Sequence, residues 1–242
     1  MLNKTLKMSE EIKEDPFEFL WNILKEVQKE TKGRVGDNYY NWSEHYNNWI
    51  DIIRPIIRSS PSFGNSLLGV RFLEFNKIIL WIQMCIHCGQ YYSALRELRF
   101  LLEFILKAYY LDKKYPNSTT EFKIQNEERL IGRRLIDELD LPNEHRSKLK
   151  ILYKELSEYT HPTKEELSPI LSGDVGARVT FAFDKDFFNK CKEFTNKVVD
   201  VVFFIIIKEY NNIINELKKD NKLLTSLKEL KCELTINCLN DL

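Results

Sequence analysis

Helix-breaking residues are scarce in this chain, and that scarcity constrains its fold more than any other feature. Among 242 residues there are 8 glycines and 7 prolines, whereas a β-rich fold of this length needs many turns. Between these residues, apolar side chains recur every three or four positions, which is the period of a helix with a buried face. The sequence therefore predicts an all-α protein: a helical bundle of four to five core helices, with an N-terminal helical extension and a long C-terminal helix.

The turn signals divide the chain into three parts. Residues 1–62 are expected to form the N-terminal helical extension, residues 63–222 the bundle, and residues 223–242 a C-terminal helical tail. Leucines spaced by threes and fours beyond Tyr210 leave two interpretations open. They could form a short coiled-coil contact between copies, or a helix that folds back on its own bundle.

Two apolar segments on either side of Gly89 predict the centre of the bundle. We expect residues 67–88 and 90–115 to form an αα-hairpin; one long helix bent at Gly89 is the alternative. Capping and breaking residues predict the other helices at 16–33, from Ser43 to a kink or an end near Pro55, from Thr119 or Thr120 to Pro142, from Asn143 through Tyr159, and onward from Asp184.

The charges of the chain balance, with 36 Lys and Arg against 36 Asp and Glu. A net charge of zero argues against recruitment to nucleic acid by the long-range field of the whole protein. The longest apolar run, residues 198–207, is about half of the ~20 residues that span a bilayer, so no membrane segment is expected. Five cysteines suit reduced thiols, and no N-terminal signal is visible, so we expect a cytoplasmic protein.

Cys85, His87 and Cys88 form the group that most invites interpretation as a metal site. On a straight helix the two cysteines lie about 60° apart, whereas His87 points about 200° away from Cys85. These three side chains cannot converge on one ion unless Gly89 breaks the helix early. No phosphate-binding glycine loop or dinucleotide fingerprint is present either. Neither a metal nor another cofactor is expected.

A narrow charged stripe marks the helix expected over residues 90–115. Arg96, Arg99, Glu103 and Lys107 share one side of a helix that is otherwise apolar almost all round. In one interpretation the stripe is a solvated edge, with Arg99 and Glu103 as an ordinary pair one turn apart. In the other, Glu103 orients an arginine in a preformed cation site.

A second polar group lies where a helix runs into His161 and is stopped by Pro162. Tyr153, Ser157 and His161 are spaced by four residues and therefore share one helix face. An imidazole in this position suits the capping of a helix C-terminus, and it also suits proton transfer near neutral pH. Ser157 is not expected to be a nucleophile, because no sharp strand–helix turn presents it and no oxyanion site is evident.

These two segments resemble the HEPN-type helical bundles. The resemblance rests on residues 94–103, where Ala94 is followed by Arg99 and Glu103 on one helix. It also rests on residues 153–162, which read Tyr-x-x-Leu-Ser-x-Tyr-x-His-Pro. Together the similar residues cover about 67–207, and the resemblance implies a helical bundle that forms a homodimer.

Active HEPN members are similar to metal-independent ribonucleases, in which a histidine exchanges a proton with RNA while an arginine stabilises the phosphate charge. The arginine of that motif is missing here, and Lys154, which lacks the planar fork of arginine, is the nearest cation before His161. The resemblance therefore implies a non-catalytic RNA- or protein-binding module in a defence or stress context. The alternatives are a toxin-like ribonuclease that uses His161 with Lys154, Arg96 or Arg99 and Glu103, and a helical scaffold unrelated to this family.

Overall fold

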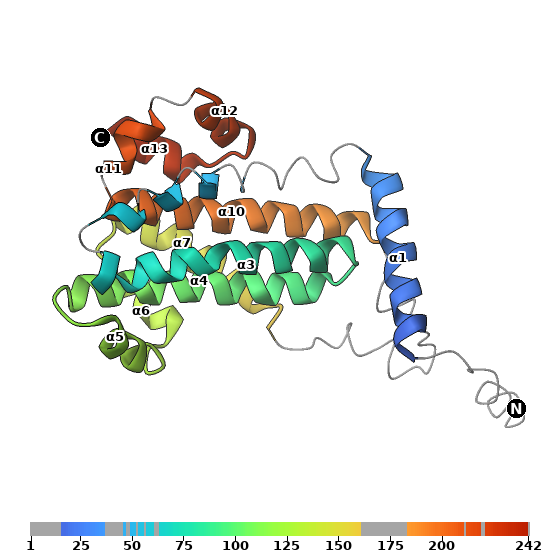
Figure 1. Cartoon of the computed structure of the whole chain (residues 1–242), viewed down its shortest axis with the longest axis horizontal. Coiled ribbons are helices and arrows are strands. Elements are labelled where there is room, and N and C mark those ends of the chain that lie inside the picture. Colours follow the sequence, from blue (N-terminus) through green and yellow to red (C-terminus); the bar gives the residue numbers. More distant parts are fainter. Residues whose placement is uncertain are drawn as a thin grey trace, which may run out of the picture.

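The chain forms an all-α helical bundle, shown as a computed structural model in Figure 1. The structure describes residues 16–36, 46–60 without 47, 48, 52 and 56, 63–160, and 183–241 without 211, 219 and 220. Every regular element in these ranges is helical, which confirms the expected fold class. None of the described helices has the length and apolar character needed to cross a bilayer.

Three long helices form the core: α3 (Leu67–His87), α4 (Tyr91–Lys114) and α10 (Lys185–Glu209). Shorter helices surround them, namely α1 (Pro16–Val35), η2 (Phe63–Asn65), α5 (Thr120–Glu127), α6 (Gly132–Glu138) and α7 (Asn143–Ser157). Helices α5, α6 and α7 pack on α4, and α1 lies against α3 at the opposite end of the bundle (Figure 1).

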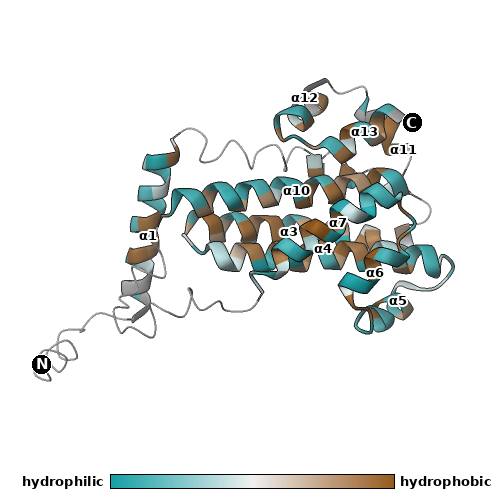
Figure 2. Cartoon of the chain, turned by 180° about the vertical axis from the view of Figure 1, so that it is seen from behind, coloured by the Kyte–Doolittle hydropathy of each residue, from teal (hydrophilic) through white to brown (hydrophobic). Residues whose placement is uncertain are grey.

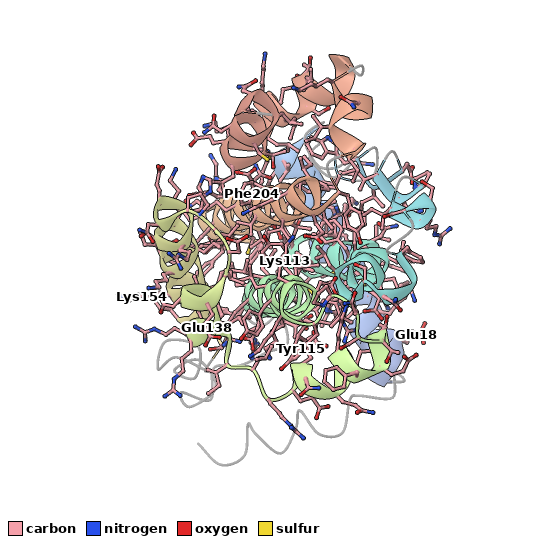
Figure 3. All side chains as sticks on the ribbon, turned by 90° about the vertical axis from the view of Figure 1, so that its left-hand side faces the viewer. Glu18, Lys113, Tyr115, Glu138, Lys154 and Phe204 are labelled. Atoms are coloured by element: carbon pink, nitrogen blue, oxygen red, sulfur yellow. The ribbon has the colours of Figure 1, made fainter. Side chains whose placement is uncertain are left out.

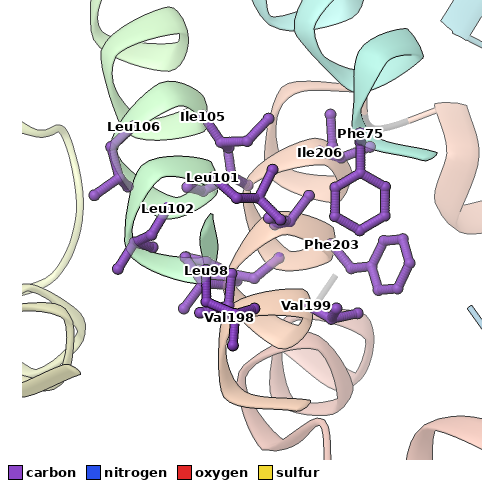
Figure 4. Packing of buried hydrophobic residues seen from close by; sticks show 14 of the residues in the cluster. Phe75, Leu98, Leu101, Leu102, Ile105, Leu106, Val198, Val199, Phe203 and Ile206 are labelled. Carbon is purple, nitrogen blue, oxygen red and sulfur yellow. The ribbon is translucent and has the colours of Figure 1, made fainter. Parts of the chain in front are cut away.

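Helix α4 is the centre of the bundle because most of its circumference is apolar. Its leucine and isoleucine side chains interdigitate with those of α10, and Phe75 of α3 closes the same layer (Figure 4). The contacting side chains are fully or almost fully buried, and they include Leu98, Leu101, Leu102, Ile105, Leu106, Val198, Val199, Phe203 and Ile206. Burying each such side chain stabilises the fold by about 1.5–3 kcal/mol, so this layer dominates the packing energy.

The turn between α3 and α4 has the predicted αα-hairpin geometry and not that of one bent helix. Gly89 adopts a positive φ of 71°, a left-handed conformation that glycine takes without steric cost. The Gln90 N–H then donates to the Cys85 carbonyl at 2.7 Å, which satisfies a carbonyl at the end of α3. Helices α3 and α4 consequently run antiparallel, and their observed boundaries lie within one residue of the predicted ones.

Three predicted helix boundaries were wrong. Helix α1 continues through Gly33 to Val35, because Gly36, with a φ of 65°, is the residue that takes the left-handed conformation. Helix α7 ends at Ser157 and not at Tyr159. Ser43 lies outside the described residues, but the chain stays helical at Pro55, so the helix does not end there; a kink or an end was expected.

The single helix expected between Thr119 and Pro142 is two helices. The Thr119 hydroxyl caps α5 as predicted, accepting from the Phe122 N–H at 3.3 Å, but α5 ends at Glu127 and α6 begins at Gly132. A Cβ built on Gly132 would lie 2.8 Å from both the Glu103 carboxyl carbon and the Tyr153 hydroxyl. The break therefore lets a residue without a side chain approach α4 and α7 closely.

After α10 the chain folds back on its own bundle, the second of the two arrangements left open for the C-terminal leucines. The segment contains α11 (Asn212–Leu217), α12 (Asn221–Glu229) and α13 (Glu233–Asp241), and α13 packs on α10 (Figure 1). The leucines that face α10 or one another are buried, namely Leu227, Leu230, Leu234 and Leu239. The Asp200 carboxylate of α10 accepts the N–H groups of Leu234 and Thr235 at 3.0 and 2.9 Å, which fixes the start of α13.

A buried ion pair joins the opposite end of the hairpin. The Asp112 carboxylate of α4 accepts the N–H groups of Leu67 and Leu68 at the start of α3, both at 2.9 Å. It also accepts the Lys123 ammonium of α5 at 2.8 Å, and only 1% of that lysine side chain is exposed. The N-cap Ser66 donates its hydroxyl to Asp112 at 2.8 Å. One carboxylate therefore holds three helices together.

We predict that Lys123→Met destabilises the protein strongly. The substitution leaves Asp112 charged in the interior without its counterion, and breaking a buried pair in this way costs about 3–5 kcal/mol. Urea unfolding followed by circular dichroism measures the change. Lys113→Met is the matched control, because Lys113 is 43% exposed in its ion pair with Glu209 and its loss should cost less than about 1 kcal/mol. Equal midpoints for the two variants would contradict the prediction.

Candidate functional site

Polar side chains from the two sequence segments meet between α4 and α7. We call Arg99, Glu103 and Lys107 of α4, with Tyr153 and Ser157 of α7, the α4–α7 polar cluster. The contacts join residues about fifty positions apart in the chain. Arg99 and Glu103 are therefore not merely a solvated pair, because both also bind α7.

The Arg99 guanidinium is engaged through all three of its nitrogens. Its Nε donates to the Ser157 hydroxyl at 3.2 Å and its Nη2 to the Tyr153 hydroxyl at 2.6 Å. The Nη1 atom lies 3.3 Å from a Glu103 carboxylate oxygen. The guanidinium carbon also lies 4.8 Å from the centre of the Tyr153 ring, a distance typical of a cation–π contact. The protein itself therefore binds every nitrogen of this cation.

Glu103 links the two cations of the cluster. One carboxylate oxygen accepts from Lys107 at 2.9 Å, and the other accepts from the Tyr153 hydroxyl at 3.0 Å. Burial alone would raise the pKa of Glu103, but the Lys107 ammonium, the tyrosine hydroxyl and the nearby Arg99 lower it below the usual value. Burial and the adjacent Glu103 charge raise the pKa of Tyr153. At neutral pH the cluster holds two cations, one carboxylate and a neutral phenol.

Two further sequence candidates, Arg96 and Lys154, lie outside this cluster. Arg96 and Lys154 are exposed, and within the described residues neither makes a hydrogen bond or an ion pair. Lys154 lies at the outer edge of the molecule in Figure 3. His161 lies outside the described residues, so its predicted meeting with a cation stays a prediction. The described segment 63–160 ends shortly after α7, with the turn that follows Ser157.

Gly132 is the residue of this region that the sequence analysis missed. It abuts both Glu103 and Tyr153 from the start of α6, so a third helix closes the cluster. An isolated glycine between two polar segments is ordinary in sequence, and its role depends on contacts with residues about thirty positions before it and twenty after it. No local pattern in the chain could have identified it.

The cysteine-rich end of α3 does not assemble a metal site within the described residues. No group of three or more His, Cys, Asp or Glu side chains there could hold an ion. Helix α3 continues through His87, as the straight-helix geometry required. Burial raises the pKa of Cys85 to about 11 and also raises that of Cys88, so both stay protonated at neutral pH and are poor ligands.

The chemistry available to the cluster follows from its hydrogen bonds. A phosphate entering it would have to displace Tyr153 and Ser157 from Arg99 and would meet the ionised Glu103 carboxylate. Ser157 donates its own proton to the Tyr153 carbonyl at 2.6 Å, an arrangement that leaves no base to activate it. The geometry therefore suits a fixed connection between α4 and α7 more than a catalytic centre.

Comparison with known proteins adds no relative to this description. The chain matches no family model, and no curated protein or solved structure shows significant similarity to it.

We predict that the Glu103 contribution to stability depends on pH. Its pKa is lowered on folding, so the stability it adds is complete above the unfolded-state pKa of about 4.3 and is lost as the pH falls through the folded-state value. Glu103→Gln should therefore destabilise the protein by about 1–2 kcal/mol at pH 7 and by much less near pH 3. Urea titrations at both pH values test this.

Glu97→Gln is the matched control for that titration. Glu97 lies on the same helix, and within the described part of the chain it forms no ion pair. A penalty for Glu103→Gln that is the same at both pH values would show that packing, and not the carboxylate charge, accounts for the role of Glu103.

Proposed function

We propose that this chain is a HEPN-like binding module without catalytic activity, which acts as a homodimer in a defence or stress context. The main support is the state of Arg99, whose three nitrogens are all bound by side chains of the same chain. A cation that must stabilise a transition state has to be available to it. Here the cation instead stabilises the packing of α7 on α4.

A hydrophobic patch on α3 supports the dimeric part of the proposal. Leu80, Trp81 and Met84 are about half exposed on adjacent turns, and we call them the α3 apolar patch. Much of α3 is hydrophobic along its length in Figure 2. Exposed apolar side chains that lie together on a protein surface often mark a contact site, so a partner is expected to cover this patch. On the neighbouring helix α4, Phe100 is 51% exposed.

The exposed area fits a contact between two copies. Half-exposed side chains of this size present about 100 Å² each, so the three residues of the α3 apolar patch give roughly 300 Å² per chain. Two copies would bury about 600 Å² of apolar surface, about two thirds of the apolar share of a standard interface of about 1,600 Å². A helix with such a patch can pack antiparallel on its own copy about a two-fold axis, which brings each patch onto the other.

The charged surface gives weaker support to RNA as the partner. The basic side chains Arg133, Arg134, Lys150 and Lys154 are exposed on α6 and α7. Acidic residues lie among them, and Lys150 forms an ion pair with Asp137. Because the net charge of the chain is zero, RNA would not be attracted over long distances. The geometry therefore favours a protein partner over RNA.

We predict that the purified chain sediments as a dimer and that Trp81→Glu converts it to a monomer. A charge at the centre of the apolar patch would be buried unpaired in the dimer, and tryptophan residues commonly dominate interface energies. Sedimentation velocity at about 1–50 μM, below and above a micromolar Kd, distinguishes the 28.9 kDa chain from twice that mass.

Trp21→Glu is the matched control, since Trp21 is a slightly more accessible tryptophan on α1, outside the patch. That variant should remain a dimer. A monomeric wild-type protein at the highest concentration, or equal dissociation of both variants, would remove the homodimer from the proposal. Nuclease-sensitive material that co-sediments with the protein would point to RNA instead.

A metal-independent ribonuclease is the second candidate, and one observation favours it. Arg99 binds Ser157, which precedes His161 by four residues, so a guanidinium already lies at the end of the helix that leads to the histidine. In that reaction the histidine would accept the 2′-hydroxyl proton, the oxygen would attack phosphorus, and the departing 5′-oxygen would take up a proton.

We predict that the protein does not cleave labelled single-stranded RNA in EDTA above the level of His161→Ala. A general acid–base contributes about 10²–10⁴-fold, so a genuine ribonuclease would lose at least a hundredfold in that variant. Lys154→Gln and Arg96→Gln serve as companion variants because both side chains are exposed. Wild-type cleavage that disappears in His161→Ala would overturn the non-catalytic proposal, whereas equal cleavage by both proteins would indicate a contaminant.

A further inference from the structure

A cavity of about 570 Å³ lies between α7, α10 and the turn that connects α12 to α13. Helices α7 and α10 lie beside one another here, since the centres of the His145 and Phe204 rings are 4.9 Å apart, and α13 packs on α10 (Figure 1). A volume of this size falls within the range of small-molecule sites, which is roughly 300–1,000 Å³. None of the residues of the α4–α7 polar cluster lines the cavity, so it is a separate site.

The floor of the cavity is apolar. Leu149 and Leu152 of α7 and Val201 of α10 line it, and all three are buried. Leu230 and Leu234 close the side next to α13 and are buried as well. Side chains of this kind offer a ligand dispersion contacts and no hydrogen bonds. The floor therefore suits a hydrocarbon body.

Charged side chains form the rim of the cavity, and their charges face the solvent. Lys148, Glu193 and Lys197 have side chains that are about half exposed or more, and Lys231 and Glu233 are exposed. Long side chains in such positions cover apolar surface with their aliphatic stems while the charged groups stay in water. The rim therefore extends the apolar wall without burying its charges.

The positive and negative charges of the rim are interleaved and compensate one another. Lys148 is paired with Glu144 at 2.9 Å, and Lys197 with Glu193 at 2.7 Å. The hydrogen bond to Glu144 raises the pKa of Lys148, and the charges of Glu144 and Glu233 raise it further. An anion would thus meet carboxylates beside the lysines, and a cation would meet lysines beside the carboxylates. Because a charged ligand would lose hydration without gaining a counterion of its own, the cavity disfavours ions of either sign.

One polar side chain in the wall has hydrogen-bond donors to spare. Asn196 of α10 lines the cavity, and its Oδ1 atom accepts the hydroxyl proton of the fully buried Tyr46, which fixes the orientation of the amide. The Asn196 amide nitrogen can donate two hydrogen bonds, and within the described residues it donates none. Asp200 also lies in the wall, but its carboxylate accepts the N–H groups of Leu234 and Thr235. The amide is therefore the polar group that a ligand can use.

We propose that this cavity binds an uncharged, largely hydrocarbon molecule that carries a carbonyl oxygen. The hydrocarbon part lies on the leucine floor, and the Asn196 amide donates to the carbonyl. The compensated rim rejects the corresponding acids and amines. This site requires neither a dimer nor catalysis, so it does not depend on the proposed function.

The test is displacement of Prodan, an uncharged fluorescent naphthyl ketone, from the full-length protein by naphthalenes that differ in one substituent. The uncharged ligand 2-acetylnaphthalene should bind with a Kd on the order of 10–100 μM, as expected for about eight buried carbon groups. The anion 2-naphthoate and the cation 2-naphthylmethylammonium should each bind at least tenfold more weakly. No displacement by about 1 mM 2-acetylnaphthalene, or equal affinity for either ion, would overturn the proposal.

Two variants locate the bound ligand. Ile151→Glu should weaken binding of 2-acetylnaphthalene about threefold to tenfold, because Ile151 lines the cavity and the substitution replaces apolar wall with a charge. Ile131→Glu is the matched control and should bind like the wild type, since both isoleucines are 59% exposed and Ile131 does not line the cavity. Equal affinities of the two variants would place the ligand elsewhere and overturn the proposal.

A third variant tests the hydrogen bond to the carbonyl. Asn196→Leu should lower the affinity for 2-acetylnaphthalene, relative to that for 2-ethylnaphthalene, about fivefold, which is the size of one hydrogen bond. An unchanged ratio of the two affinities would contradict the role given to Asn196. The ionic ligands probe the wild-type protein, so the proposal remains testable even if Asn196→Leu fails to fold.

Discussion

The burial of α4 is the constraint on which the rest of the structure depends. Helices α3, α5, α6, α7 and α10 all contact it, so Arg99, Glu103 and Asp112 emerge against neighbouring helices, whereas Arg96 remains exposed. A buried polar group without a partner costs several kcal/mol. Arg99 and Glu103 therefore require α7, and Asp112 requires the start of α3 and the lysine of α5. The need for these polar partners determines which helix packs on each side of α4. Apolar packing alone would not determine it.

The sequence was most informative where structure depends on neighbouring residues. The hairpin at Gly89 and the Asp184 cap of α10 were predicted because glycine conformation and side-chain capping act within a few positions. The predictions that were wrong concern features that neighbouring residues alone do not determine. Gly33 and Gly36 both look like helix ends, and only the backbone conformation shows that Gly36 is the one used. Phe100 continues an apolar face in sequence, yet no described helix covers it fully.

The candidate site could be predicted in its parts but not in its assembly. The pairing of Arg99 with Glu103 follows from a spacing of four on one helix. The binding of Arg99 to Tyr153 depends on how α7 packs on α4, and that packing is decided by leucines spread over both helices. The burial of Lys123 could not be predicted from the sequence either. Lysine side chains are mostly exposed in proteins, and the counterion that allows this one to be buried belongs to another helix.

The two buried carboxylates show why similar geometry gives different electrostatics. Asp112 and Asp200 each accept two backbone N–H groups at the start of a helix, an arrangement that favours a negative charge. Asp112 also has Lys123 beside it, whereas Asp200 has hydroxyl and amide donors instead of a buried cation. Burial consequently outweighs the hydrogen bonds at Asp200, and its pKa is raised.

A raised pKa means that the folded chain binds this proton more tightly than the unfolded chain does. Through Asp200, stability therefore increases as the pH falls through the folded-state pKa, the opposite of the dependence at Glu103. The hydrogen bonds of Asp200 nevertheless determine where along α10 the helix begins, and the buried side chains of Leu230, Leu234 and Leu239 attach the segment to the bundle by apolar packing.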